Sequence, residues 1–173
     1  NYVINHYCRQ IGLEFDRDGE IARRGAICRP LLDELNGMEF YHQSGPKSLG
    51  REWVETQVYP MLERYGLSLE DKLRTFYEHA AFQIFRIINA NPSSAGNGKL
   101  LITGGGAFNK FLVERIEALC PCQIVIPGRQ IIEYKEALIF AFLGALYMAD
   151  EPGCLASVTG ASMDNIGGML FKV

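Results

Sequence analysis

Apolar residues recur at helical spacing along the first half of the chain. Residues 2–10 and 20–35 are predicted to form two short helices, separated by the polar turn DRDG, because their apolar side chains return every three or four positions. A long loop rich in glycine and polar residues follows over 37–53, and its end overlaps the start of a helix predicted for 49–65. Ser68 then begins the longest helix, because serine is a favourable N-cap residue. The pattern therefore indicates a helical first half.

The pattern changes after the polar segment 89–98, which contains asparagine, proline, serine and glycine and little apolar surface. Apolar runs at 100–103 and 123–126 predict strands, and the longer stretches at 109–119 and 133–149 predict helices. A strand–helix–strand–helix series implies parallel strands joined by right-handed crossovers. The second half of the chain thus predicts an α/β unit.

Length and composition limit the possible functions. The chain has 173 residues, of which 48% are hydrophobic, enough for one globular domain with a sizeable core. Its net charge of −3 gives no broad basic surface, which argues against binding to nucleic acid or to an anionic membrane. The longest apolar run, 137–149, is shorter than the roughly 18 to 20 residues that span a bilayer, and no secretory signal opens the chain. This composition and net charge are most consistent with a small-molecule ligand.

The five cysteines are odd in number and include no C-x-x-C pair, which argues against a disulfide framework or a zinc ribbon and favours free thiols in a reducing cytosol. They are Cys8, Cys28, Cys120, Cys122 and Cys154. The three histidines show no H-E-x-x-H spacing. The sequence therefore predicts no set of metal ligands of its own.

Three consecutive glycines, Gly104, Gly105 and Gly106, follow the first predicted strand in the stretch LLITGGGAFNKFL. Ligands of open α/β sheets bind beyond the carboxyl ends of the strands, and glycine lets the main chain approach a ligand closely. A dinucleotide fingerprint would need glycine at Asn109 and an acidic residue about 20 positions later, and no complete P-loop is present. The glycines therefore mark either a ligand site or a tight strand-to-helix corner, and a dinucleotide-binding oxidoreductase ranks last.

The segment LLITGGGAFNKFLVERIE resembles the adenosine motif of the actin-like sugar kinase and Hsp70 superfamily. Together with GPKSLGREW upstream and EYKEALIFAFLGAL and ASVTGAS downstream, it resembles the carboxyl-terminal half of the anhydro-N-acetylmuramic acid kinase family. Ser157, Thr159 and Gly160 of the last segment match the family without an assigned role. The sequence departs from the family at Phe108, where histidine is common, and at Ala156, where proline is common, so the exact sugar is left open.

The resemblance implies an actin-like protein of two domains, in which residues 1–173 form a single carboxyl-terminal domain. That domain would have an α/β, ribonuclease-H-like fold, with several helices packed on a mixed sheet that contains a parallel βαβ unit. The chain starts at Asn1 without a leading strand, so we expect an amino-terminal domain before it to be its partner. Whether the protein is a homodimer is left open.

The family uses ATP and Mg²⁺ to phosphorylate 1,6-anhydro-N-acetylmuramic acid while water opens the anhydro ring, a step of cell-wall recycling in the bacterial cytoplasm. The resemblance therefore implies a kinase whose ligands are ATP and an anhydro-amino-sugar. Its general-base aspartate would stand in an FDTGPGN-like segment just before Asn1, so the chain alone is expected to be inactive. The alternative is a non-catalytic nucleotide-binding or structural domain with the same fold.

The resemblance also assigns roles to individual positions. Gly104 to Gly106 and Ala107 match the turn that contacts the nucleotide. Asn109 either caps the following helix, the preferred interpretation, or donates its amide to the nucleotide. Glu136 matches the glutamate that faces the sugar, although an acidic residue near a helix N-terminus also interacts favourably with the helix dipole.

The loop GPKSLGRE provides a second group of candidates, which could order the rim of the cleft. These are Lys47, Ser48, Arg51 and Glu52. In the alternative interpretation Ser48 caps the helix that follows, and Lys47 and Arg51 are solvated surface charges.

Overall fold

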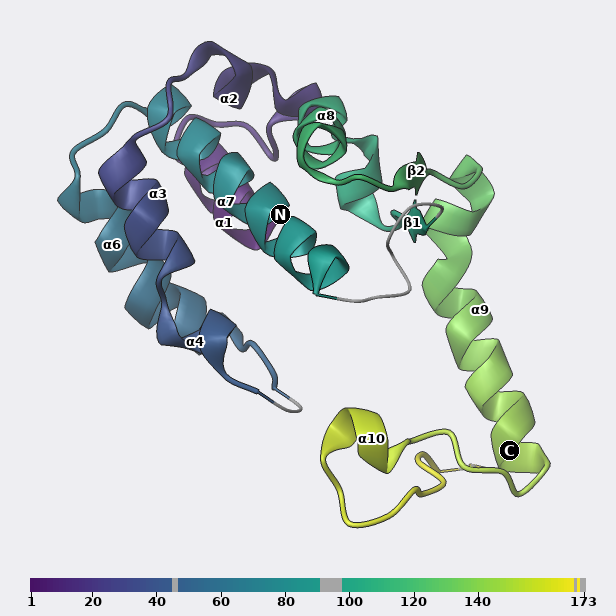
Figure 1. Cartoon of the computed structure of the whole chain (residues 1–173). Helices are drawn as coiled ribbons and strands as arrows, with labels where there is room; N and C mark the ends of the chain where they lie inside the picture. Colours follow the sequence, from purple (N-terminus) through teal and green to yellow (C-terminus); the bar gives the residue numbers. More distant parts are fainter. Residues whose placement is uncertain (45–46, 91–97, 170, 172–173) are drawn as a thin grey trace.

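The computed structural model describes residues 1–44, 47–90, 98–169 and 171. Its helices are α1 (Tyr2–Arg9), α2 (Glu20–Arg24), α3 (Arg29–Asn36), α4 (Glu39–His42), α5 (Arg51–Trp53), α6 (Tyr59–Arg64), α7 (Leu69–Asn89), α8 (Lys110–Leu119), α9 (Arg129–Met148) and α10 (Ala156–Thr159). Its strands are β1 (Lys99–Leu101) and β2 (Gln123–Val125), and the shorter helical turns are η1 (Arg17–Gly19), η2 (Val54–Val58) and η4 (Gly105–Phe108). Figure 1 shows α7 in the middle of the helical part and α9 beyond the two strands.

The helical part is built around α7, against which α1, α2, α3 and α8 pack. The predicted cap of α7 is confirmed, since the Ser68 hydroxyl accepts a hydrogen bond from Asp71 N over 3.1 Å. The least exposed large side chains gather in one apolar cluster around this helix. They include Tyr7, Leu31, Leu35, Leu62, Leu73 and Tyr77. Burying each large apolar side chain contributes roughly 1.5–3 kcal/mol, so this cluster stabilises the helical part.

The helix predicted for 20–35 is wrong in one respect, because the chain leaves helical conformation between α2 and α3. The N–H of Ala26 donates to Asp71 Oδ1 over 2.7 Å, and that of Cys28 donates to Thr75 Oγ1 over 3.0 Å. A Cβ at Gly25 would lie 2.1 Å from the backbone oxygen of Glu70. Side chains of α7 thus replace the intrahelical acceptors, and glycine makes the close approach possible.

The helix predicted for 49–65 is confirmed as three consecutive segments, α5, η2 and α6. The middle segment is π-helical, and Pro60 at the start of α6 has no N–H with which to continue an i→i−4 ladder. Within the preceding loop, the sequence pattern missed the short helix α4.

The predicted parallel βαβ unit is confirmed by β1, α8 and β2. The two strands pair in parallel, with Leu100 opposite Ile124, and α8 connects them. The described residues contain no further strand that would make the sheet mixed. Taken together, the described residues form a mostly helical domain with a small two-stranded parallel sheet.

Helix α9 is longer than predicted, because it begins directly after Gly128 rather than at 133. Of its twenty residues only Ile132 is buried, and large side chains such as Phe140 and Met148 are more than 70% exposed. The tail after α9 turns back and forms one antiparallel bridge between Cys154 and Asn165. Among the described residues, no helix combines the length and apolar character needed to cross a membrane.

Candidate functional site

The glycine turn, residues 104–106, lies at the carboxyl end of β1, where the sequence places it. Ile102 N still donates to Val125 O over 3.0 Å, so the parallel pairing continues past Leu101. The chain then reverses at Gly104, which has φ 78° and ψ 179°, and passes through η4 into α8. The turn thus sits at the edge of the sheet where ligands of parallel α/β units bind.

Neither backbone conformation nor internal packing explains glycine at two of the three positions. Gly104 needs glycine because of its positive φ. At Gly105 and Gly106 an added Cβ would meet only the side chains of Asn1 and Leu112, at 3.6–3.7 Å, which is ordinary van der Waals contact. Nothing in the described residues therefore demands two further glycines in this turn.

Two other glycines show what a tight corner looks like in this chain. A Cβ at Gly19 would lie 2.3 Å from Phe111 Cβ, and one at Gly25 would lie 2.1 Å from a backbone oxygen. Those glycines are explained by close packing of neighbouring elements. The contrast favours ligand approach over the tight-corner interpretation for Gly105 and Gly106.

Asn109 and Ala107 serve the structure around the turn. Asn109 Oδ1 accepts from Leu112 N over 2.9 Å and caps α8, as preferred from the sequence. Its Nδ2 donates to Tyr77 Oη over 2.6 Å and to the Asp16 carbonyl over 3.2 Å. Ala107 is buried, and its N–H donates to Gly104 O over 2.9 Å. Both residues hold the turn, and the glycine main chain is left to face outward.

A cavity of about 300 Å³ lies beside the turn and brings together segments far apart in the sequence. Its lining residues are Asn1, Ile4, Asn5, Phe15, Asp16, Asp18, Tyr77, Gly105, Phe108 and Asn109. Most of those outside the glycine turn carried no signal in the sequence, because an asparagine in an amphipathic helix or an aspartate in a polar turn is ordinary. Only the fold assembles them around Gly105.

The polar groups of the cavity are acidic or neutral. Asp16 is buried and accepts hydrogen bonds from Ile21 N at 2.9 Å and Ala22 N at 3.2 Å, so it also holds the start of α2. Burial raises the pKa of Tyr77, which keeps its phenol neutral. Within the described part of the chain, no lysine or arginine lines the cavity. The cavity therefore suits an uncharged ligand group with hydrogen-bond donors better than a phosphate.

Residues 45 and 46 of the segment GPKSLGRE lie outside the described residues, and Arg51 of this segment contacts Tyr2 of α1. Arg51 Nε donates to Glu55 Oε1 over 2.7 Å, and the Arg51 guanidinium lies over the ring of Tyr2, 5.4 Å from its centroid. Tyr2 Oη also donates to Glu55, over 2.8 Å. Tyr2 follows Asn1, whose side chain lies against the glycine turn. The fold thus brings Arg51 to the helix that borders the turn.

The other candidates of this loop are not placed at the cavity. Lys47 Nζ donates to the carbonyls of Phe40 and Gln43, over 2.8 and 3.1 Å, so it anchors the loop to α4. Gly50, not Ser48, is the N-cap of α5, and no side chain caps that helix. Glu52 is exposed. These three residues do not converge with the glycine turn.

Helix α9 contacts η4, the helical turn that contains Gly105 and Gly106. Glu136 is exposed and does not line the cavity, so its role toward a sugar stays a prediction. The preceding residue, Lys135, donates from Nζ to Thr103 Oγ1 over 2.8 Å. The sequence analysis missed Lys135, although its place beside Glu136 could have drawn attention to it.

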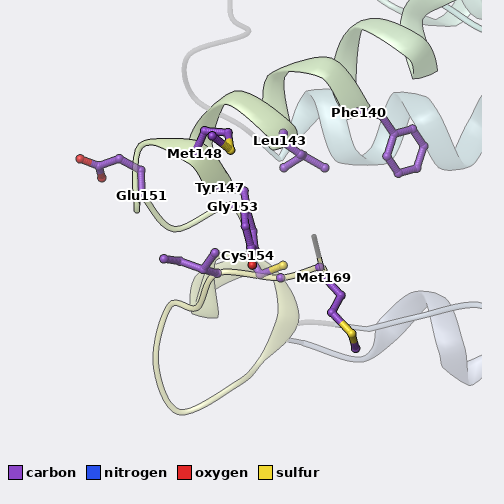
Figure 2. Close-up of a pocket in the computed structure, with 12 residues that line it drawn as sticks. Phe140, Leu143, Tyr147, Met148, Glu151, Gly153, Cys154 and Met169 are labelled. Atoms are coloured by element: carbon purple, nitrogen blue, oxygen red, sulfur yellow. The ribbon is translucent and has the colours of Figure 1, made fainter. Parts of the chain in front are cut away.

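A second, larger opening of about 400 Å³ lies between α9 and the tail. Figure 2 shows Leu143 and Tyr147 on α9 and Cys154 and Met169 on the tail around it. Its wall is mostly aliphatic, aromatic and sulfur-containing, and among the described residues Glu151 is the one charged residue that lines it. It lacks the several convergent polar groups of a chemical site.

A comparison with known protein families assigns the chain to one of them. The sequence model described as anhydro-N-acetylmuramic acid kinase matches residues 1–173, the whole length of the chain. The match includes the glycine turn, the GPKSLGRE loop and the start of α9. The chain therefore belongs to the anhydro-N-acetylmuramic acid kinase family, a family of ATP-dependent sugar kinases.

Proposed function

We propose that the protein uses ATP to phosphorylate 1,6-anhydro-N-acetylmuramic acid with hydrolytic opening of its anhydro ring, and that this chain supplies the nucleotide-binding half. Family membership supports the reaction. The observation that carries the nucleotide role is the turn 104–106 at the carboxyl end of β1, where the positive φ of Gly104 requires glycine but neither φ nor packing requires it at Gly105 and Gly106.

In this proposal the nucleoside lies against the turn, close to Gly105 and Gly106. A side chain there would hold the ribose or base away from the main chain. The adjoining cavity offers the amides of Asn1 and Asn5 and the apolar rings of Phe15 and Phe108. Such a mixture of flat apolar surface and a few polar groups suits a purine nucleoside.

The remainder of the active site belongs, in this proposal, to sequence before Asn1. The domain would be ribonuclease-H-like, with additional strands beside β1 and β2, and an amino-terminal domain would form the other wall of the cleft. The Asn1 side chain lies beside the glycine turn. A general-base aspartate a few residues earlier would thus stand within reach of groups bound over that turn.

The chemistry then follows from positioning. The aspartate takes a proton from water, the water oxygen bonds to the anomeric carbon, and the bond from that carbon to the bridging oxygen breaks. The released oxygen on C6 attacks the γ-phosphorus of ATP, and ADP leaves. Glu136, two turns inside α9, would face the sugar.

Magnesium would be held mainly by the nucleotide. Within the residues that the structure describes, no three His, Cys, Asp or Glu side chains come together as a metal site. Mg²⁺ retains several waters and binds through phosphate oxygens with one or two carboxylates, so such a cluster is not required. We assign the reaction to cell-wall recycling in the bacterial cytoplasm, a compartment in which the five free cysteines would stay reduced.

The experiment is nucleotide binding and sugar-dependent ADP release by the full-length protein, with alanine at Gly105 or Gly106. These positions have ordinary φ angles and room for a Cβ, so the variants should fold. We expect ATP affinity to fall at least about tenfold, equivalent to about 1.4 kcal/mol.

The control is Gly37→Ala, a position in the helical part whose φ of −83° alanine also adopts. It should leave ATP affinity unchanged. Equal ATP affinity in all variants would refute the nucleotide role of the turn. ATP binding without any sugar-dependent ADP release would instead favour a non-catalytic nucleotide-binding domain.

A further inference from the structure

We propose that Lys135 binds the phosphate chain of the nucleotide, so that the nucleotide crosses the glycine turn with its nucleoside toward the cavity and its phosphates toward α9. This inference rests on the proposed nucleotide role of the turn and adds a residue and a direction to it.

The position of the Lys135 ammonium is fixed by the end of β1. Its Nζ donates to Thr103 Oγ1 over 2.8 Å, and Thr103 directly precedes Gly104. Both side chains belong to half-buried residues. A positive charge is thus held beside Thr103, one residue before the turn.

The charge of Lys135 is not neutralised by the described part of the chain. No carboxylate of these residues lies within ion-pair distance of Lys135, whereas Arg129 on the same helix pairs with Glu133 over 2.6 Å. An ammonium group has three donors, and only one of them is used here. Because a partly desolvated cation is unfavourable without a counter-charge, the arrangement favours an anionic ligand.

The other side of the turn has the opposite electrostatic character. Asp16 and Asp18 line the cavity there, and no lysine or arginine of the described residues does. Nearby Lys110 pairs with Asp18 over 3.3 Å. A polyphosphate would be repelled on this side and attracted on the other, which sets the direction of the nucleotide.

Such a cation has a clear use in phosphoryl transfer. Negative charge shifts toward the bridging oxygen and the ADP phosphates as the γ-phosphoryl group leaves, and a fixed positive charge stabilises it without reorganisation. The ammonium group would therefore act on the phosphates and have little effect on the nucleoside.

The test measures affinities of the full-length protein for adenosine, AMP, ADP and ATP in the presence of Mg²⁺. Lys135→Gln should weaken ADP and ATP binding about 10- to 100-fold, as expected for a charge-assisted contact, and change adenosine binding less than twofold. Lys135→Arg should restore most of the loss. Arg129→Gln removes a charge of the same sign from the same helix and should change none of the four affinities more than twofold.

Two results would overturn the inference. One is an equal loss for adenosine and ATP in Lys135→Gln, which would indicate a structural role. The other is unchanged ATP affinity in Lys135→Gln while Gly105→Ala still weakens ATP, which would leave the proposed function intact. If the unsubstituted protein binds none of the four ligands, the proposed function and this inference both fail.

Discussion

The helical part of the molecule and helix α9 are both rich in apolar side chains, yet they use them in opposite ways. Around α7, side chains such as Leu73 and Tyr77 are completely buried. Along α9, Leu138, Phe140 and Phe142 are at least 60% exposed. The helical part has a core of its own, whereas α9 has apolar surface and no core.

This difference shows which region of the chain buries its apolar side chains by itself. A helix that is apolar on all sides is normally buried within a larger structure, and extended exposed apolar surface marks a contact with another part. The exposed α9 therefore supports the proposal that further strands and a second domain complete the molecule. The candidate nucleotide turn lies at the junction between the two regions.

The largest expected effect compares one leucine from each region. Leu73→Ala removes a fully buried side chain and should lower the free energy of unfolding of this chain by about 2–5 kcal/mol. Leu138→Ala, at an exposed position, should lower it by less than about 0.5 kcal/mol. Urea denaturation of the chain measures both. Equal losses would mean that α9 has a core after all, and a larger Leu138→Ala loss in the full-length protein would sharpen the contrast.

A pH effect of intermediate size should be confined to the helical part. His79 is buried between Asn36, at 2.7 Å, and Tyr41, at 3.0 Å, and desolvation lowers its pKa from 6.5 to about 4. Below pH 6.5 the unfolded chain therefore binds a proton that the folded chain does not. Stability should fall as the pH drops, by about 2 kcal/mol at pH 5, and should not depend on this group above pH 7.

Urea denaturation at pH 7 and pH 5 measures this loss. His79→Gln, which cannot become charged, should show a loss smaller by about that amount. The same loss in the variant as in the unsubstituted chain would assign the pH effect to other groups.

The last prediction compares one glycine-to-alanine substitution in each region, and the two should change stability in opposite directions. Gly25→Ala forces a Cβ to 2.1 Å from the Glu70 oxygen and should destabilise the helical part by about 1–3 kcal/mol. Gly144→Ala lies within α9, with no atom within 4 Å of its Cβ, and should stabilise the chain by about 0.5–1 kcal/mol. Thermal unfolding distinguishes the two. A destabilising Gly144→Ala would show that α9 already packs against something in this chain.

Sequence reasoning succeeded where the determining interactions are local. The caps at Ser68 and Asn109 and the order β1, α8, β2 follow from residues a few positions apart. The break after Arg24 was not predictable, because the side chains that cause it come from α7, more than 40 residues away.

The same distinction between local and long-range interactions applies to the residues of the candidate site. The glycine turn could be found from a short stretch, whereas the cavity beside it depends on Asn5 and Phe15, which only the tertiary structure brings near. Lys135 belongs to a helix whose start the sequence pattern placed four residues too late. Its contact with Thr103 spans 32 positions.

The side chain of Asn109 links three segments of the molecule. It caps α8, holds the Tyr77 hydroxyl of α7 and reaches the carbonyl of Asp16. A displacement of the glycine turn would stretch all of these bonds at once. We therefore expect that a molecule pressing on that corner would displace the start of α8, the Tyr77 hydroxyl and the Asp16 carbonyl together.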